Sequence, residues 1–251
     1  MSLASRASNI SPHSLAGRLI RFPLTLVPRN MVVRVATGIN KGKLWITGTG
    51  PTNGCWIGTY EADHTVALLN LVRPGMIAYD VGANAGYYTL ALSSLVGDTG
   101  HVYSFEPEAR NADALRRHIQ LNRLRNVTLV QVAANDRSGM VGFQGTSATG
   151  SISSHDEYKV PCISLDEFVA AGNPSPSFIK MDIEGAERAA LVGSASILSR
   201  GDVTWLMATH SEKLRNQCRA LMVDYGYRFG GLDGRGDPGE AADFVAIPRR
   251  S

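Results

Sequence analysis

The chain has 251 residues, of which 44% are apolar and 19% are charged, and its formal net charge is +3. This composition excludes an intrinsically disordered chain, and the length is sufficient for one sizeable globular domain. The chain has three cysteines that lie far apart, Cys55, Cys162 and Cys218, and it has no CxxC pair or histidine-rich tract near them. This argues against a disulfide framework or a zinc knuckle and favours a reducing compartment.

Charge is distributed unevenly along the chain. Residues 1–60 contain seven basic side chains and no Asp or Glu, whereas residues 61–251 are net negative. We therefore predict a basic N-terminal extension or cap (1–60) that acts as a lid or contacts an anionic membrane surface, followed by a main domain (61–251). Arg and Pro residues interrupt the apolar stretch 15–33, so neither a membrane span nor a signal peptide is expected. The expected location is cytoplasmic, with peripheral membrane contact as a further expectation.

From Met76 onward, apolar strand segments alternate with segments that carry apolar residues at helical spacing. Strands are expected within 76–86, 101–107, 127–133, 177–185 and 202–210, and helices within 87–97, 108–122, 186–198 and 212–226. Ser164 and Glu167 match a capping box, so a short helix is expected from Leu165. This alternation predicts a parallel sheet with helices packed on it.

Two further segments complete the predicted fold. The Gly- and Ser-rich residues 145–154 are expected to form a mobile loop. Two short strands, at 227–229 and 244–247, are expected to form a terminal hairpin, which makes the last strand antiparallel to the rest of the sheet.

The turn DVGANAG, from Asp80 to Gly86, carries the clearest binding signal. In a doubly wound sheet, ligands bind outside the carboxyl ends of the strands, where this turn lies. Gly82 and Gly86 allow the backbone to approach a ligand closely. Glu106 ends the next strand, close to the offset at which a carboxylate binds a ribose diol. Together these residues predict a ligand that contains adenosine.

Asn84 bears on which adenosine ligand binds. It occupies the position at which a dinucleotide site requires glycine, because the pyrophosphate presses against the backbone there. S-adenosylmethionine (SAM) contains adenosine without a phosphate, and Asp80 can help to place its ammonium, directly or through the turn. SAM is therefore the expected cofactor, and an NAD-dependent oxidoreductase is the alternative.

Charged and apolar residues alternate between Phe178 and Glu184. Lys180, Asp182 and Glu184 lie on one face of this predicted strand, and the opposite face is apolar. Charges in a central parallel strand are costly unless they reach the open mouth of the sheet or pair with one another. We predict that these three residues are catalytic residues at the mouth, and the alternative is an internal ion pair that orders the strand end.

Four segments, DVGANAGYYT, FEP, AANDRSG and IKMDIEGAE, resemble the FkbM-type SAM-dependent methyltransferases in order and spacing, over roughly Tyr60–Leu198. The resemblance implies an α/β, Rossmann-like class I methyltransferase fold with seven mostly parallel strands. It also implies O-methyl transfer to a hydroxyl of a sugar, glycolipid or natural product. Further, it implies that the methionine end of SAM contacts Asp80, Gly82, Asn84, Gly86 and Tyr88, that Glu106 binds the ribose, and that Ala134 and Asn135 lie beside the adenine.

Methyl transfer to a hydroxyl requires a proton acceptor. His210 ends the fifth predicted strand at the same rim, and the ordinary histidine pKa of about 6.5 suits this task. Asp182 is the competing base. A third alternative is a divalent cation held by Asp182, Glu184 and His210, but no paired ligand motif follows the strand, so no metal is expected.

The expected partner is a small or lipid-linked hydroxylated acceptor. The loops 145–154 and 231–242 and the N-terminal segment are expected to close over the mouth. The basic N-terminus leaves an RNA methyltransferase as an alternative, but the strand faces lack the basic and aromatic residues that single-stranded nucleic acid requires, so no nucleic acid is expected. Four side chains are candidates for stacking on or hydrogen-bonding a sugar: Trp56, Tyr60, Tyr87 and His155.

Overall fold

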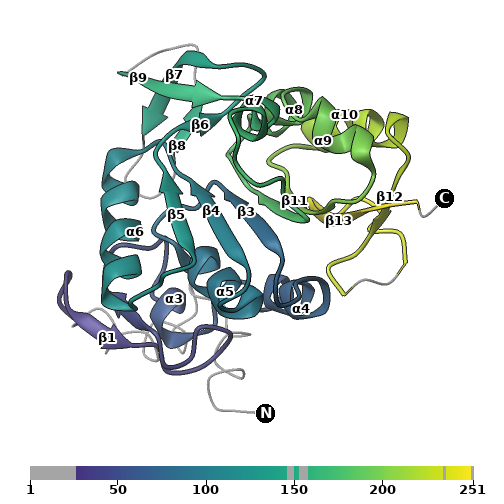
Figure 1. Cartoon of the computed structure of the whole chain (residues 1–251). Helices are drawn as coiled ribbons and strands as arrows, with labels where there is room; N and C mark the ends of the chain where they lie inside the picture. Colours follow the sequence, from purple (N-terminus) through teal and green to yellow (C-terminus); the bar gives the residue numbers. More distant parts are fainter. Residues whose placement is uncertain (1–26, 146–149, 153–157, 234–235, 250–251) are drawn as a thin grey trace.

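The computed structural model describes residues 27–145, 150–152, 158–233 and 236–249. Its centre is a seven-stranded sheet with the order β12-β13-β11-β10-β3-β4-β5 (Figure 1). Among the described strands of this sheet, β13 alone runs against the common direction. The predicted sheet, with its antiparallel last strand, is therefore confirmed. The strands are β3 (Ile77–Val81), β4 (His101–Phe105), β5 (Val127–Val130), β10 (Phe178–Met181), β11 (Thr204–Ala208), β12 (Tyr227–Gly230) and β13 (Asp243–Pro248).

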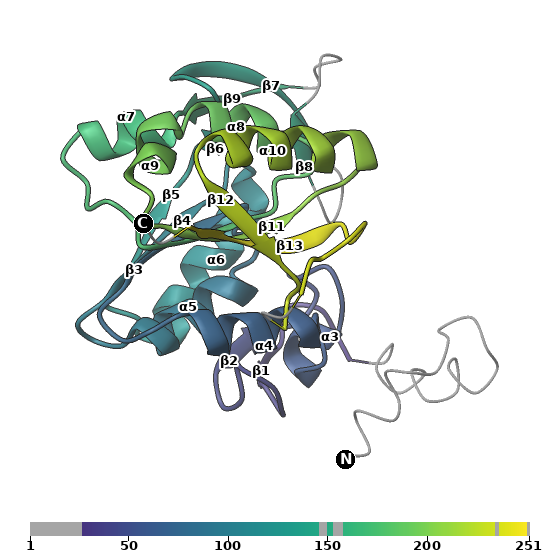
Figure 2. The same cartoon turned by 90° about the vertical axis from the view of Figure 1, so that its right-hand side faces the viewer.

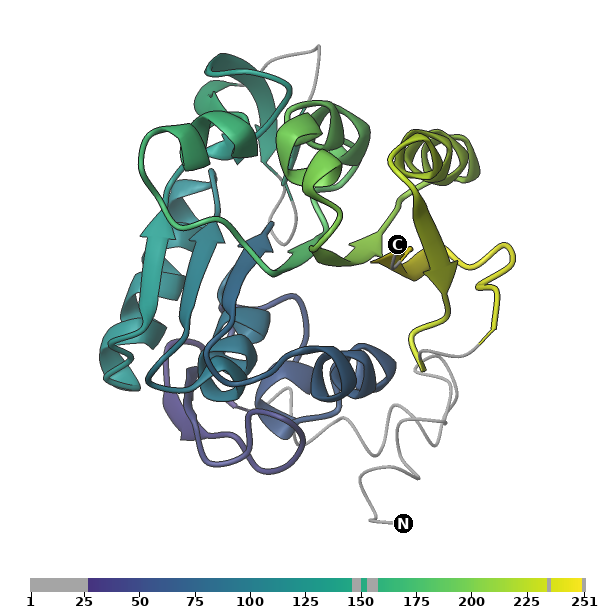
Figure 3. The ribbon, with the colours of Figure 1, turned by 45° about the vertical axis from the view of Figure 1, so that its right-hand side comes forward.

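Helices cover both faces of the sheet, which separates them into two layers (Figures 2 and 3). One layer contains α4 (Ala62–Leu71), α5 (Tyr87–Val96) and α6 (Ala109–Leu121). The other contains α7 (Leu165–Ala170), α8 (Glu187–Val192), α9 (Ala195–Arg200) and α10 (Glu212–Asp224). Ser164 and Glu167 form the predicted capping box at the start of α7.

The alternation of side chains along the strands divides the core in two. Ile179 and Met181 of β10 join the cluster under α7–α10, whereas Phe178 joins the cluster under α4–α6. Lys180 lies on the same side as Phe178, and β10 pairs with β3 so that Lys180 is opposite Asp80. Both charged residues are buried, so the sheet register places an ion pair inside the domain.

The described part of the N-terminal segment packs on the first helix layer. A short antiparallel hairpin, β1 (Val32–Arg34) and β2 (Leu44–Ile46), precedes α3 (Gly54–Ile57). Trp45 stacks on His118 of α6 with ring centroids 4.1 Å apart, and is fully buried. This segment therefore contributes to the core, while the domain division at residue 60 stays a prediction. In the described ranges, no helix has the length and apolar character needed to cross a membrane.

A second, four-stranded sheet follows β5, with the order β6-β9-β7-β8. The strand expected over 127–133 ends at Val130, and Ala133 pairs with Cys162 in the second sheet instead. Part of the loop expected at 145–154 is also strand, since Gly145 pairs with Gly150, while 146–149 and 153–154 lie outside the described residues. The strands of this second sheet are β6 (Ala133–Ala134), β7 (Gly139–Gly145), β8 (Gly150–Ile152) and β9 (Tyr158–Ile163).

Candidate active site

A pocket lies beyond the carboxyl ends of β3, β4 and β10. It encloses about 900 Å³ of empty space, including its open mouth. The turn after β3 forms its floor, and Glu106, which follows β4, and Asp182, which follows β10, form parts of its wall. This position agrees with the expectation from the sequence that a ligand site forms at these strand ends.

The turn after β3 requires glycine for steric reasons. Gly82 has φ +83°, and a Cβ at this position would lie 1.9 Å from the carbonyl oxygen of Asp182. Gly86 has φ +96° and precedes α5, where a Cβ would lie 2.4 Å from Leu115 Cδ1. Asn84 adopts φ +49°, a conformation that asparagine tolerates better than most residues. Gly82 and Asn84 line the pocket, whereas Gly86 lies behind it and supports the turn.

Glu106 is held by backbone donors from both sides. The N–H of Asn84 donates to Glu106 Oε2 at 2.7 Å, and the N–H of Glu108 donates to Oε1 at 2.9 Å. The side chain is buried but lines the pocket, and burial raises the pKa of Glu106 to about 7. The side chain of Asn111, which also lines the pocket, forms a further hydrogen bond with Glu106, so the carboxylate is an acceptor group at the pocket wall.

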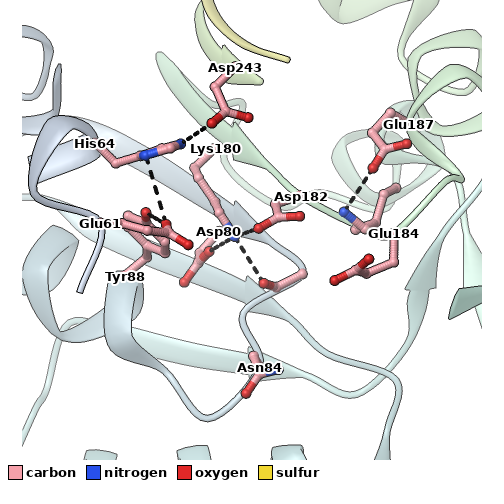
Figure 4. A network of polar contacts seen from close by, with 12 residues as sticks. Glu61, His64, Asp80, Asn84, Tyr88, Lys180, Asp182, Glu184, Glu187 and Asp243 are labelled. Atoms are coloured by element: carbon pink, nitrogen blue, oxygen red, sulfur yellow. Dashed lines mark hydrogen bonds and ion pairs between the residues drawn. The ribbon is translucent and has the colours of Figure 1, made fainter. Parts of the chain in front are cut away.

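Lys180 connects the ends of β3 and β10. Its Nζ donates to the carbonyl oxygen of Gly82 at 3.0 Å and lies 3.6 Å from Asp80 Oδ1 and 3.8 Å from Asp182 Oδ2 (Figure 4). Burial alone would lower the pKa of Lys180, but the Asp182 and Asp80 carboxylates outweigh this and raise it. The ammonium also lies 4.8 Å from the ring centroid of Tyr88, which lines the pocket.

Asp80 does not line the pocket. Its side chain is fully buried, and it accepts a hydrogen bond from Thr89 Oγ1 at 2.7 Å in addition to its contact with Lys180. Of the two ways in which the sequence suggested that Asp80 serves a ligand, the structure therefore favours the indirect one. Asp80 fixes Lys180 and the base of the glycine turn.

His210 lies among three carboxylates. Its Nε2 is 3.3 Å from Asp182 Oδ1 and 3.3 Å from Glu184 Oε2, and its Nδ1 is 3.0 Å from Glu187 Oε1. The hydrogen bond to Glu187, together with the charges of Asp182 and Glu184, raises the pKa of His210 to about 9 against the opposing effect of burial. Asp182 and Glu184 line the pocket, and Glu184 adopts φ +54°, which is unusual for a residue other than glycine.

The same three predicted residues also offer metal ligands. One atom each of Asp182, Glu184 and His210 lies within 4.8 Å of the others. Carboxylate and imidazole groups at this spacing suit a divalent cation, although the ionic contacts of a protonated His210 with the two carboxylates account for the same geometry.

Four site residues were not predicted from the sequence. Glu61, which precedes α4, accepts a hydrogen bond from the hydroxyl of Tyr88. His64 Nε2 lies 3.5 Å from Asp243 Oδ2, on the same side of Lys180 as Glu61 (Figure 4). Glu187 comes three residues after Glu184, within the quoted IKMDIEGAE segment, so its place in that motif was a usable signal. Glu61, His64 and Asp243 lie in segments without a comparable pattern.

The remaining predicted residues divide into two groups. Ala134, Tyr60 and Tyr87 line the pocket, joined by Trp45. Asn135 instead faces β9, where its side chain contacts Cys162 Sγ at 3.8 Å. Outside the pocket lining, Trp56 donates to Asn53, and His155 lies outside the described residues. The roles assigned to these residues stay predictions.

Comparison with known proteins identifies the family. The model of the methyltransferase FkbM domain matches residues 80–229. The hexuronic acid methyltransferase AglP of Haloferax volcanii is 27% identical over 143 residues, covering 55% of this chain and 58% of that protein. A protein-L-isoaspartate O-methyltransferase of Methanothrix thermoacetophila is 40% identical over 76 residues, covering 29% of this chain and 36% of that protein. The matched part of this chain thus spans between about a third and three fifths of the length of these curated relatives.

A solved structure supports the fold. The crystal structure of methyltransferase FkbM from Methylobacillus flagellatus KT superposes with a TM-score of 0.52 at 19% identity, covering 75% of this chain and 50% of that chain. The family match confirms SAM as the cofactor expected from the sequence. The family model matches more than half of the chain, including the strand ends from which the pocket is built. This chain therefore belongs to the FkbM family of SAM-dependent methyltransferases.

Proposed function

We propose that this chain transfers a methyl group from SAM to a hydroxyl oxygen of a sugar-containing or lipid-linked acceptor. One observation carries the proposal: Asp182 and Glu184, which line the same pocket as Glu106, each lie 3.3 Å from His210 Nε2. A hydroxyl must lose a proton when it attacks a methyl group, and a positioned base accelerates this step. The site thus combines a cofactor side with a proton-accepting side.

On the cofactor side, each residue has a proposed contact. The carboxylate of Glu106 would accept hydrogen bonds from the ribose hydroxyls, and the backbone of Gly82 and Asn84 would lie along the methionine end with Tyr88. Ala134 would lie beside the adenine. These assignments are supported by the lining of the pocket, which includes the buried Glu106.

On the acceptor side, we propose that His210 is the base and that Asp182 orients the acceptor hydroxyl. Bound SAM would supply an activated methyl group to the acceptor oxygen, and its sulfur would keep the electron pair of the carbon–sulfur bond. The hydroxyl proton passes to His210 Nε2. The surrounding carboxylates raise the pKa of His210 to about 9, so the neutral form that accepts the proton is the minor one near pH 7, although it is a stronger base than an ordinary histidine. The rate of methyl transfer should therefore rise with pH toward 9.

A sugar acceptor is supported by the relative from Haloferax volcanii, which is named a hexuronic acid methyltransferase. The pocket wall also contains aromatic side chains suited to the apolar faces of sugar rings, namely Trp45, Tyr60 and Tyr87. Most of the acceleration would come from holding the acceptor oxygen in line with the methyl group and from excluding water.

The experiment that tests this function is incubation with methyl-labelled SAM and an extract of the source cells. We expect label in a small glycosylated fraction or a lipid fraction, and label in RNA or protein instead would contradict the acceptor class. Glu106→Gln should abolish labelling, because it removes the carboxylate that faces the pocket. Glu108→Gln is the matched control, since Glu108 caps α6 and does not line the pocket.

Replacement of His210 separates chemistry from cofactor binding. His210→Gln should lower the rate of methyl transfer by about 10²–10⁴-fold while SAM raises the melting temperature as in the unmodified protein. His101→Gln is the control, because His101 lies at the opposite end of the sheet, at the start of β4. Chelation by EDTA should leave the rate unchanged; a complete loss that Mg²⁺ restores would favour the cation alternative.

We also propose peripheral membrane contact, which suits a lipid-linked acceptor. Met31 and Val32 are 45% and 50% exposed, and the exposed Arg29 and Arg34 flank them. Apolar side chains between cations match the headgroup region of an anionic bilayer. The protein should sediment with phosphatidylserine vesicles at low salt, and Met31→Ser with Val32→Ser should reduce this; equal sedimentation with phosphatidylcholine vesicles would contradict the charge-dependent contact.

A further inference from the structure

Glu187 is a buried carboxylate that the proposed reaction does not yet use. It is the first residue of α8 and is fully buried. Its Oε1 is 3.0 Å from His210 Nδ1, and its two oxygens also accept hydrogen bonds from the backbone N–H groups of Ile183 and Gly185 at 3.1–3.2 Å. Among the ion pairs of the described residues, His210 is the cationic partner of Glu187. A buried carboxylate therefore lies directly behind the candidate base.

The contact restricts the protonation of His210. An ionised carboxylate can only accept hydrogen bonds, so the Nδ1 atom that faces Glu187 must carry a proton. The second ring nitrogen, Nε2, points toward Asp182 and Glu184, which border the pocket. Both nitrogens face carboxylates, so both carry a proton in the imidazolium form. The hydrogen bond to the buried Glu187 holds the Nδ1 proton, whereas Nε2 lies 3.3 Å from the half-buried Asp182 and Glu184, so the Nε2 proton is the one that leaves before Nε2 takes the proton of an acceptor hydroxyl.

We propose that Glu187 is a positioning residue for this reaction: it holds His210 in the tautomer with a proton on Nδ1 and directs Nε2 toward the acceptor. The inference rests on the proposed function, because it assigns Glu187 its role through His210. The arrangement corresponds to the acid–histidine pair of hydrolytic triads, in which the carboxylate fixes the tautomer and stabilises the imidazolium without itself becoming protonated.

A purely structural role for Glu187 makes a different prediction. Its hydrogen bonds to Ile183 and Gly185 hold the segment that carries Glu184, so loss of the carboxylate could disturb that segment alone. In that case, replacement of Glu187 would change stability but not the proton affinity of His210. The position of the His210 titration therefore distinguishes positioning from support of the loop.

Several other charged or titratable groups face this pair and contribute to the titration. Asp182 and Glu184, from the segment after β10, and Asp243, from β13, act on His210 directly, while Lys180 of β10 acts on Glu184 and the neutral thiol of Cys218, from α10, faces Glu187. All of these remain in a Glu187 variant. The shift caused by replacing Glu187 is therefore a difference measured against a constant background.

The first test follows the His210 titration by NMR in the full-length protein, with SAM absent. The midpoint in the unmodified protein should lie near 9, and Glu187→Gln should lower it by about 1–2 pH units, because a neutral amide replaces a carboxylate in direct contact. Glu167→Gln is the matched control, since Glu167 caps α7 and contacts Ser138 and Ser164, away from His210. An unchanged midpoint in a folded Glu187→Gln protein would overturn the proposal.

A second measurement needs no variant. The ring ¹⁵N shifts of His210 above its midpoint should report a proton on Nδ1, and a proton on Nε2 would overturn the proposal even if Glu187→Gln fails to fold. Once the labelling experiment has supplied an acceptor, the rate of methyl transfer can be measured against pH. In Glu187→Gln, the acid limb of this profile should move to lower pH and the plateau rate should fall at least tenfold. An acid limb that does not move would contradict the proposed role of Glu187. Failure to find any methylated acceptor would contradict the proposed function and leave the NMR result to stand by itself.

Discussion

The two sides of the pocket are built in different ways. On the cofactor side, Glu106 is fixed by backbone N–H groups of Asn84 and Glu108, all within two neighbouring strand–helix units. On the acceptor side, side chains from distant parts of the chain come together: Glu61 and Asp243 both contact His64, and His210 contacts Asp182. The cofactor side therefore depends on backbone geometry, and the acceptor side depends on charge, so substitutions and pH should affect them differently.

Lys180 joins the two sides, and its removal should have the largest effect on stability. Lys180→Met leaves Asp80 buried without its cation, which should cost about 3–5 kcal/mol of unfolding free energy, measured by urea denaturation. The double variant Lys180→Met with Asp80→Asn is the control, because it removes both charges and should be more stable than the single variant. If the double variant is less stable, the Asp80–Lys180 ion pair is not what holds these strand ends together.

Gly82→Ala tests the backbone side of the comparison and should have the next largest effect. A Cβ would clash with the carbonyl oxygen of Asp182, and alanine would have to adopt a left-handed backbone conformation. We therefore expect the unfolding free energy to fall by about 2–4 kcal/mol and SAM binding to be lost. Gly226→Ala is matched in conformation, with φ +79° but nothing within 4 Å of its Cβ, and should cost about 1–2 kcal/mol. Equal losses in both variants would show that the contact with Asp182 is unimportant.

The same contrast explains what the sequence could predict. The glycine turn and Glu106 are recognisable because one strand, its turn and the next strand place them within about 25 residues, where local patterns are informative. The alternation that includes Lys180 and Asp182 also predicts a charged strand end. It does not reveal that Asp80 and Lys180 neutralise each other inside the domain, because that depends on the pairing of β3 with β10.

Long-range pairing also accounts for the features that the sequence did not show. Asp243 reaches the site because β13 pairs with β11, and Glu61 because α4 packs beside Tyr88. The second sheet forms by backbone pairing of β7 with β9, which does not require a distinctive local composition. A Gly- and Ser-rich stretch therefore indicated a loop where the structure places part of a hairpin.

The smallest effect that we expect is the pH dependence of SAM binding, which distinguishes the cofactor side of the pocket from the acceptor side. In the protein without SAM, burial raises the pKa of Glu106 from 4.5 to about 7. The ribose hydroxyls of SAM would donate hydrogen bonds to the ionised carboxylate. Binding should therefore release a proton below pH 7, and the Kd for SAM should rise by about tenfold per pH unit as the pH falls from 7 to 5. Above pH 7 the Kd should be constant, because His210, whose pKa is raised to about 9 by its carboxylate neighbours, belongs to the proposed acceptor side.

Isothermal titration calorimetry in two buffers of different ionisation enthalpy measures both the Kd and the released proton. Glu106→Gln should bind SAM weakly and with the same Kd at pH 6 and pH 8, since the titrating group is gone. A Kd that changes near pH 9 and is constant between pH 5 and 7 would reverse the assignment. Binding would then depend on the charge of His210, and the two sides of the pocket would be coupled despite their different construction.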